Sequence, residues 1–238
     1  AGMGAGMGAG MGAGMGAGMG AGKRSVASSE NIKMHMLSGS GKLNTNTLQI
    51  KKREMGKLSG LRKLNINDIY NYLKKHPNST PNGKNLIITF IEFNNIFVKL
   101  GNVSGTTQTV PLYSNFIQSI WNQFGTIKGR GDKNWPKNAR IVNIIDLISG
   151  LSIILENNDN KTPSIFNMIG NYAYTINYTQ IKNYITQVFK MIYIIDDSIV
   201  CVKDANANIL AKVTTDSFCN SDTTTMTFEQ FKQIYNNN

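Results

Sequence analysis

Two adjacent aspartates, Asp196 and Asp197, lie between two hydrophobic runs and are the clearest candidates for catalysis in this sequence. Carboxylates at the end of a strand can hold the magnesium ions that promote phosphoryl transfer. Such a site needs a further carboxylate, and the one candidate, Asp146, lies in a stretch predicted to be helical. We therefore interpret the pair as turn residues. A metal-dependent nucleotidyl-transfer enzyme that uses Asp196 and Asp197 is kept as a second alternative.

A glycine-containing run, residues 38–42, invites comparison with a phosphate-binding loop, in which backbone amides and a lysine bind the phosphates of a nucleotide. The spacing does not fit. The pattern requires glycine where Met36 stands and serine or threonine where Leu43 stands, and no strongly apolar strand precedes the run. We expect a basic linker here and no nucleotide cofactor.

Histidine and cysteine are scarce, which argues against nucleophilic catalysis and against a zinc site. The two histidines, His35 and His76, lie in a loosely patterned basic segment without an obvious orienting carboxylate. The two cysteines, Cys201 and Cys219, lack the paired spacing of zinc ligands and are too few for a disulfide framework. We expect free, buried thiols in a reducing compartment and no metal or other cofactor.

Lysine and arginine are concentrated in residues 23–84, where 13 basic residues against 3 acidic ones give +10 of the chain's net charge of +11. Such side chains neutralise phosphates and release counterions, which predicts salt-sensitive nucleic-acid binding without base recognition. No aromatic residue precedes Tyr70 in this segment, so we expect no stacking on unpaired bases. A solvated, solubilising face and an anionic membrane surface are the alternatives. The residues expected to contact phosphates are Lys23, Arg24, Lys51, Lys52, Arg53, Lys57, Arg62 and Lys63.

Hydrophobic periodicity and turn residues predict the elements that would position these side chains. Within the basic segment, Gly56 and Gly60 are interpreted as flexible joints, and Asn67 with Asp68 is expected to cap a short helix. The predicted elements are helices over residues 69–75, 111–124, 140–155 (interrupted by Gly150), 178–193 and 227–235 (capped by Thr227 with Glu229 nearby), a strand over 86–93, and a hairpin of strands 194–202 and 209–213.

The first 22 residues are five copies of Ala-Gly-Met-Gly followed by Ala-Gly. A helix is excluded because each interior glycine costs about 1 kcal/mol relative to alanine. As a strand, the repeat places every side chain on one face, as in silk, and this requires a partner surface. A membrane span is not expected, because only the methionines are large and apolar. We predict an arm that is disordered alone or extended within an assembly.

Together these patterns predict an α+β protein with one compact, helix-rich domain and a small β component. We expect an arm over residues 1–22, a basic, partly flexible segment over 23–84, and a globular domain over 85–238. The predicted function is that of a non-enzymatic structural protein of an assembly, such as a virion or nucleoprotein component, located inside the cell or within a virion. Its expected partners are nucleic acid, bound through phosphates, and copies of itself or other subunits. A membrane-associated protein anchored by the glycine-rich N-terminus is the first alternative.

Overall fold

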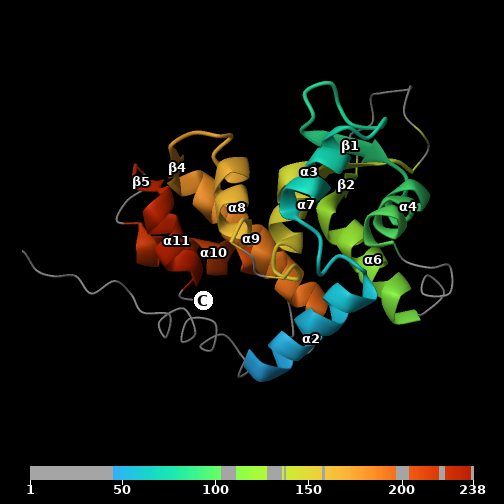
Figure 1. Ribbon diagram of the computed structural model, residues 1–238, viewed down its shortest axis with the longest axis horizontal. Helices are drawn as coiled ribbons and strands as arrows, with labels where there is room; N and C mark the ends of the chain where they lie inside the picture. Colours follow the sequence, from blue (N-terminus) through green and yellow to red (C-terminus); the bar gives the residue numbers. More distant parts are fainter. Residues whose placement is uncertain are drawn as a thin grey trace, which may run out of the picture.

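Helix α9 (Tyr178–Ile195) lies at the centre of the molecule, and several other helices pack against it (Figure 1). The computed structural model describes residues 45–102, 111–127, 136, 138–156, 159–196, 204–219 and 223–236. The buried residues Ile181, Phe189 and Ile192 help to attach α9 to its neighbours. Those neighbours are α2 (Thr45–Leu58), α6 (Pro111–Phe124), α7 (Ile144–Leu151), α8 (Lys161–Ile169) and α10 (Asp204–Phe218).

Two small antiparallel sheets accompany the helices, so the α+β class predicted from the sequence is confirmed. In the larger sheet, β3 (Arg140–Asn143) lies between β1 (Asn85–Ile88) and β2 (Gly125–Ile127). The smaller sheet pairs β4 (Thr175–Asn177) with β5 (Thr225–Thr227). In each sheet, two directly opposed residues bury their apolar side chains in the core. These pairs are Leu86 with Val142 and Ile176 with Met226.

Four of these strands run directly into helices, and the residue at each junction caps the helix. Thr89, the residue after β1, caps α4 (Phe90–Gly101). The Glu92 side chain in turn accepts a hydrogen bond from the Thr89 N–H at 2.7 Å. Such reciprocal bonds satisfy backbone N–H groups that the first turn of a helix leaves unpaired. The other junctions are Asn143 before α7, Asn177 before α9, and Thr227 before α11 (Phe228–Asn236).

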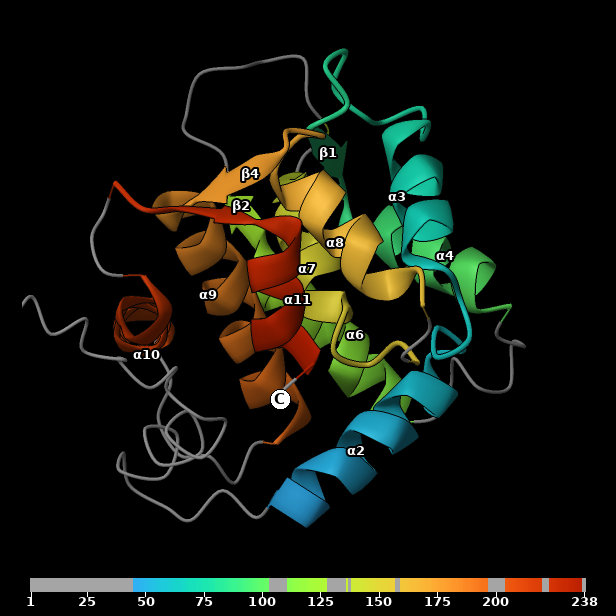
Figure 2. The same ribbon diagram turned by 60° about the vertical axis from the view of Figure 1, so that its left-hand side comes forward.

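The basic segment contributes two helices to the same core as the rest of the described chain. Helix α2 carries Leu48 and Met55 on its buried side and lies along the lower edge of the body in both views (Figures 1 and 2). Helix α3 (Ile66–Lys74) buries Ile69 and Leu73 and packs on α7 and α8. Over residues 48–84 the segment is therefore an integral part of the folded body, not a separate arm. The arm predicted over residues 1–22 lies outside the described residues.

Three of the predicted helices are confirmed, and one is shifted. Helix α6 has the predicted bounds, α9 extends two residues beyond its predicted end, and α11 follows Thr227 as expected. The side chain that bonds back to Thr227 is Gln230, however, and not Glu229. Helix α3 begins at Ile66 because Asn65, ahead of the predicted cap, accepts a hydrogen bond from the Asn67 N–H at 2.8 Å.

Two predictions failed because capped junctions divide apolar stretches into a strand and a helix. The strand predicted over 86–93 ends at Ile88, because Thr89 and Glu92 start helix α4. The helix predicted over 140–155 begins as strand β3, and Asn143 starts α7 by accepting from the Asp146 N–H at 3.0 Å. The helix ends close to the predicted interruption, because Gly150 is the second-last residue of α7, which ends at Leu151. A Cβ atom at Gly150 would come within 2.5 Å of the Phe124 ring.

The hairpin predicted over residues 194–202 and 209–213 is wrong, because Ile194 and Ile195 are the last residues of helix α9. The rest of its first strand, residues 197–202, lies outside the described residues. Residues 209–213 belong to helix α10, whose buried side consists of small residues. Ala207, Ala211 and Thr215 recur every four residues, so they form one stripe of the helix, and α10 packs against α9. The apolar residues Ile209 and Val213, which suggested a strand, point to solvent.

Gly56 and Gly60 were predicted to be flexible joints, and both are instead points of close backbone packing. A Cβ atom on Gly56 would lie 2.6 Å from the carbonyl oxygen of Ile154. Gly60 has φ of +70°, and a Cβ atom there would lie 2.0 Å from the Gly101 oxygen at the end of α4. The turn between α2 and α3 therefore depends on glycine for its conformation and for its contact with α4.

We expect Gly60→Ala to lower the free energy of unfolding by at least about 2 kcal/mol, because strain at positive φ adds to the overlap with the Gly101 carbonyl. Gly83→Ala is the matched control. Gly83 also has positive φ, at +64°, but its added Cβ would meet only the movable side chain of Lys74. Urea denaturation should show a clearly smaller loss for the control, and equal losses would contradict the packing role of Gly60.

Candidate nucleic-acid interface

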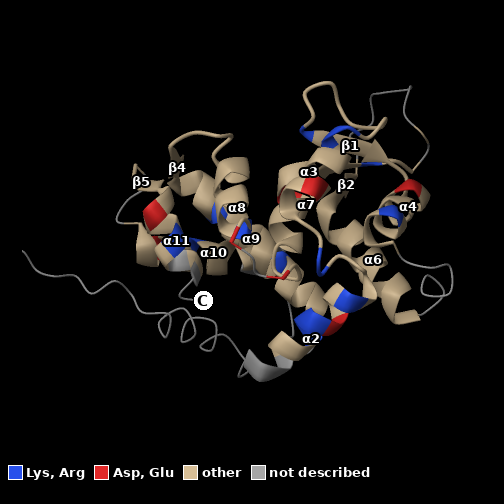
Figure 3. Ribbon diagram, viewed as in Figure 1, with Lys and Arg blue, Asp and Glu red and all other residues tan. Residues whose placement is uncertain are grey.

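Six of the eight residues predicted to contact phosphates are described by the structure, and they lie on α2 and on the turn that follows it. Lys23 and Arg24 lie outside the described residues. Figure 3 shows basic residues along α2, on the stretch between α2 and α3, near β1 and on α4. With 3.6 residues per turn, neighbouring positions on α2 face different sides. The cations that are adjacent in sequence are therefore in different environments.

Lys51 is bound to a carboxylate of the body. Its Nζ atom lies 2.7 Å from Oδ1 of Asp196, 145 residues away in the sequence. The Asp196 side chain is only 6% exposed and that of Lys51 is 30% exposed. Water screens this pair poorly, so the attraction is stronger than in a surface pair. Lys51 therefore holds α2 on the end of α9 and is not an open phosphate contact.

The same ion pair bears on the second alternative, a metal-dependent enzyme that uses Asp196 and Asp197. Asp196 follows the last residue of helix α9, and its carboxylate is engaged by Lys51. Asp197 lies outside the described residues. Asp146, the expected third carboxylate, lies in the first turn of α7, and burial raises its pKa while the charge of Lys190 lowers it. Among the described residues, no three His, Cys, Asp or Glu side chains come together in a way that could hold a metal ion.

Lys52 is turned toward the body and is also poorly placed for phosphate. Burial lowers its pKa. Lys161, at the start of α8, is only 4% exposed and donates a hydrogen bond to the Leu155 carbonyl at 3.0 Å. Burial, and then the charge of Lys52, lower the pKa of Lys161 to about 8. Two of the predicted contacts, Lys51 and Lys52, thus belong to the inner side of α2.

Arg62 is neutralised by an acidic neighbour in the turn after α2. Its guanidinium lies 2.5 Å from a carboxylate oxygen of Glu156. The backbone reinforces the contact, because the Glu156 N–H donates to the Arg62 carbonyl at 2.7 Å and the Arg62 N–H donates to Gly56 at 3.1 Å. Arg62 therefore attaches this turn to the segment after α7, and its charge is largely offset.

Arg53, Lys57 and Lys63 remain as the exposed cations of the predicted set. Arg53 and Lys57 are one turn apart on the outer side of α2, about 6 Å along its axis, and Lys63 lies in the turn that follows. Glu54 is exposed on the same helix and offsets part of this charge. The structure thus leaves three of the predicted cations open, and side chains of this kind can contact phosphates without recognising the base sequence.

A second group of cations, not among the eight predicted contacts, surrounds the C-terminal end of α3. Lys75 and Lys99 line one hollow, although α3 and α4 are separated by β1 in the sequence. Lys74 extends over the Tyr70 ring at 5.6 Å, and its stem lies against Gly83. Lys74 and Lys75 are visible in the sequence as basic residues at a helix end, but the approach of Lys99 follows only from the fold.

Two further features bear on the sequence-based predictions. Cys219 is a free, buried cysteine as expected, and Cys201 lies outside the described residues. In the described part of the chain, every helix is too short or too polar to cross a membrane.

Comparisons of the chain with protein-family models, with curated proteins and with solved structures found no match. The chemistry of these surfaces is therefore the basis for the function proposed below.

Removing the carboxylate of the buried ion pair should destabilise the protein. We expect Asp196→Asn to lower the free energy of unfolding by about 3 kcal/mol, because a partly buried Lys51 loses its counter-charge. The matched control is Asp216→Asn, whose amide oxygen can still accept the hydrogen bond from the Tyr178 hydroxyl. Only the exposed ion pair with Lys212 is lost, which should cost less than about 1 kcal/mol. Urea denaturation measures both values, and a loss at Asp196 no larger than at Asp216 would contradict the docking role of the pair.

The buried lysine at position 161 should make stability depend on alkaline pH. In the folded state its pKa is about 8, whereas in the unfolded chain it returns to about 10.5. Between these values the unfolded chain binds more protons, so stability rises with pH. From pH 8 to 10 we expect the free energy of unfolding to rise by about 2 kcal/mol relative to Lys161→Met.

The control for this pH dependence is Lys232→Met, which removes an exposed lysine from α11 and should leave the rise unchanged. Denaturation curves recorded at several pH values compare the three proteins. The same pH profile in Lys161→Met and in the unmodified protein would refute the assignment to Lys161.

Proposed function

We propose that this chain is a non-enzymatic structural protein of an assembly, such as a virion or nucleoprotein component, and that it binds nucleic acid through phosphates. The proposal rests on one observation: Arg53, Lys57 and Lys63 are exposed, while neighbouring cations attach α2 to the body. A helix fixed on its inner side presents its outer cations at constant positions. Such a surface favours phosphate contacts independent of base sequence.

The sequence ahead of α2 adds two cations and a repeat to this proposal. Lys23 and Arg24 belong to the same basic segment and would add phosphate contacts. The Ala-Gly-Met-Gly repeat, with all its side chains on one face when extended, would contact copies of the protein or other subunits. On this proposal the protein acts within a virion or inside the cell, where nucleic acid and the other subunits are present.

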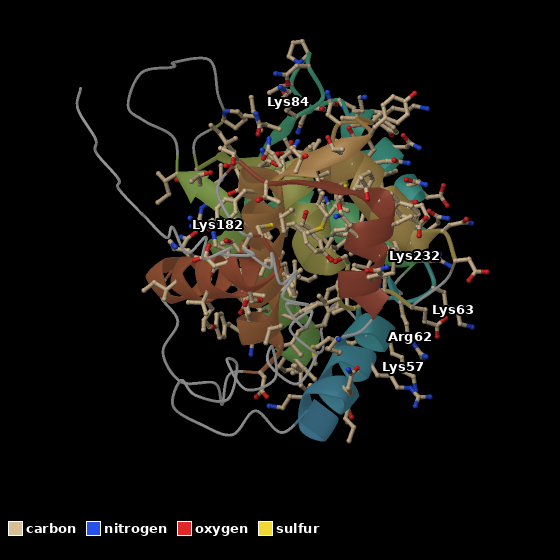
Figure 4. The ribbon with its side chains drawn as sticks, turned by 90° about the vertical axis from the view of Figure 1, so that its left-hand side faces the viewer. Lys57, Arg62, Lys63, Lys84, Lys182 and Lys232 are labelled. Carbon is tan, nitrogen blue, oxygen red and sulfur yellow. The ribbon has the colours of Figure 1, made fainter. Side chains whose placement is uncertain are left out.

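The test compares two double variants of equal charge in the full chain. Lys57→Gln with Lys63→Gln removes two of the proposed contacts, whereas Lys182→Gln with Lys232→Gln removes lysines from α9 and α11. Figure 4 shows Lys57 and Lys63 on the right of the view with Lys232 above them, and Lys182 on the left. Affinity for a duplex of about 20 base pairs is measured by fluorescence anisotropy over a range of salt concentrations.

We expect the Lys57 and Lys63 double variant to bind duplex DNA about tenfold more weakly at moderate salt. Its slope of log affinity against log salt should be shallower by about 2, because each lost phosphate contact releases about one counterion fewer. The Lys182 and Lys232 variant should bind like the unmodified protein. Equal weakening of both variants would point to net charge alone, and salt-independent binding would refute the proposal.

A further inference from the structure

The C-terminal ends of α3 and α4 enclose a hollow of about 460 Å³ that opens to solvent. This volume falls within the range of small-molecule sites. The two helices lie on the same side of the molecule (Figure 2). The hollow combines ring side chains with basic groups, and its lining residues are Asn71, Tyr72, Lys75, His76, Pro77 and Lys99.

The charged groups at this hollow favour an anion. Lys75 and Lys99 are both exposed and line the hollow directly. The acidic residue that acts on this site is Glu92, whose charge raises the pKa of His76. Its oxygens are already bound, because one accepts from Asn78 Nδ2 at 2.9 Å and the other from the Thr89 N–H at 2.7 Å. These hydrogen bonds lower the pKa of Glu92 and keep it charged, so two lysines at the hollow face one nearby carboxylate and positive charge is in excess.

His76 adds a neutral donor and a planar surface. Its Nδ1 atom accepts a hydrogen bond from the Asn78 N–H at 3.2 Å. In the neutral ring the proton must then reside on Nε2, which can donate to a ligand. Burial is the main cause that lowers the pKa of His76 and favours this neutral form. The His76 ring lies 6.4 Å from that of Tyr72, centre to centre.

Both helices end at this hollow, so Lys75 and Lys99 also lie near the backbone carbonyls of the last helical turns. Cations in the last turn of a helix stabilise those carbonyls without any ligand. That purely structural role does not account for the placement of Tyr72, His76 and Pro77 around the same concave surface. Two ammonium groups beside such rings match a ligand that has both an anionic group and a planar ring.

From these contacts we infer that the hollow between α3 and α4 binds an unpaired nucleotide, with its phosphate at Lys75 and Lys99 and its base against Tyr72 and His76. The inference rests on the proposed nucleic-acid function and extends it from duplex phosphates to a single-stranded segment. A stacked duplex cannot place a base in a concave site, whereas a single strand can. Helix α3 is about 14 Å long at 1.5 Å per residue, and it separates the hollow from Lys63.

The experiment uses the full chain and two labelled probes: an oligothymidylate of about ten nucleotides and the DNA duplex described above. Lys75→Gln with Lys99→Gln alters the hollow, and Lys57→Gln with Lys63→Gln is the matched control on α2. We expect the hollow variant to lose about tenfold in affinity for the single strand and little for the duplex. The α2 variant should show the larger loss for the duplex.

Tyr72→Leu separates stacking from charge. We expect it to weaken single-strand binding severalfold without changing the affinity for duplex DNA. Thymidine monophosphate should displace the single strand from the unmodified protein at lower concentration than inorganic phosphate does, since only the nucleotide carries a base. Equal displacement by both compounds, or full single-strand affinity in Tyr72→Leu, would overturn the nucleotide assignment.

Thermal unfolding of each variant distinguishes binding from helix stabilisation. If the Lys75 and Lys99 double variant has a lowered melting temperature but unchanged affinity for the single strand, the two lysines only stabilise the helix ends. That result would refute the nucleotide site. In that case, weakened duplex binding by the α2 variant would still support the proposed function. Unchanged binding of both probes by both double variants would refute the proposed function and the inference together.

Discussion

The ion pair between Lys51 and Asp196 determines how the basic segment is presented. It joins the inner side of α2 to the end of α9, across 145 residues of sequence, and Leu48 and Met55 add apolar contacts on the same side of α2. Once this side is attached, the helical repeat places Arg53 and Lys57 on the outside. A second ion pair, between Arg62 and Glu156, holds the turn that follows. The segment of highest charge is thereby part of the folded surface.

The body to which α2 is attached is built from short strands that lead into capped helices. Asn177 caps α9, the helix whose end carries Asp196, and the same residue is the last of β4, which pairs with β5. Thr89 likewise caps α4, and the last turn of α4 places Lys99 beside the C-terminal end of α3. The caps fix where each helix starts, and the helix length then sets where its last residues lie. The positions of both groups of cations therefore follow from a few polar junction residues.

The capped junctions also explain which elements could be predicted from the sequence. Helices α6 and α9 were found because their apolar residues recur at spacings of three and four over many residues. Residues 86–93 and 140–155 were each assigned to one element, although Thr89 with Glu92 and Asn143 mark helix starts within them. Those signals were legible in the sequence. Helix α10 could not be recognised in the sequence, because its buried side consists of small residues, Ala207 and Ala211, whose burial depends on the packing of α10 against α9.

The sequence by itself determined that positive charge is concentrated in residues 23–84 and that the rest of the chain is nearly neutral. It also determined the amphipathic helices and their caps, because these depend on residues a few positions apart. Only the tertiary structure decided which cations remain open: Lys51 pairs with Asp196, the charge of Lys52 acts on the buried Lys161, and Lys99 lines the same hollow as Lys75. Such contacts join residues far apart in the chain, so their charges depend on the packing of whole helices and not on local sequence.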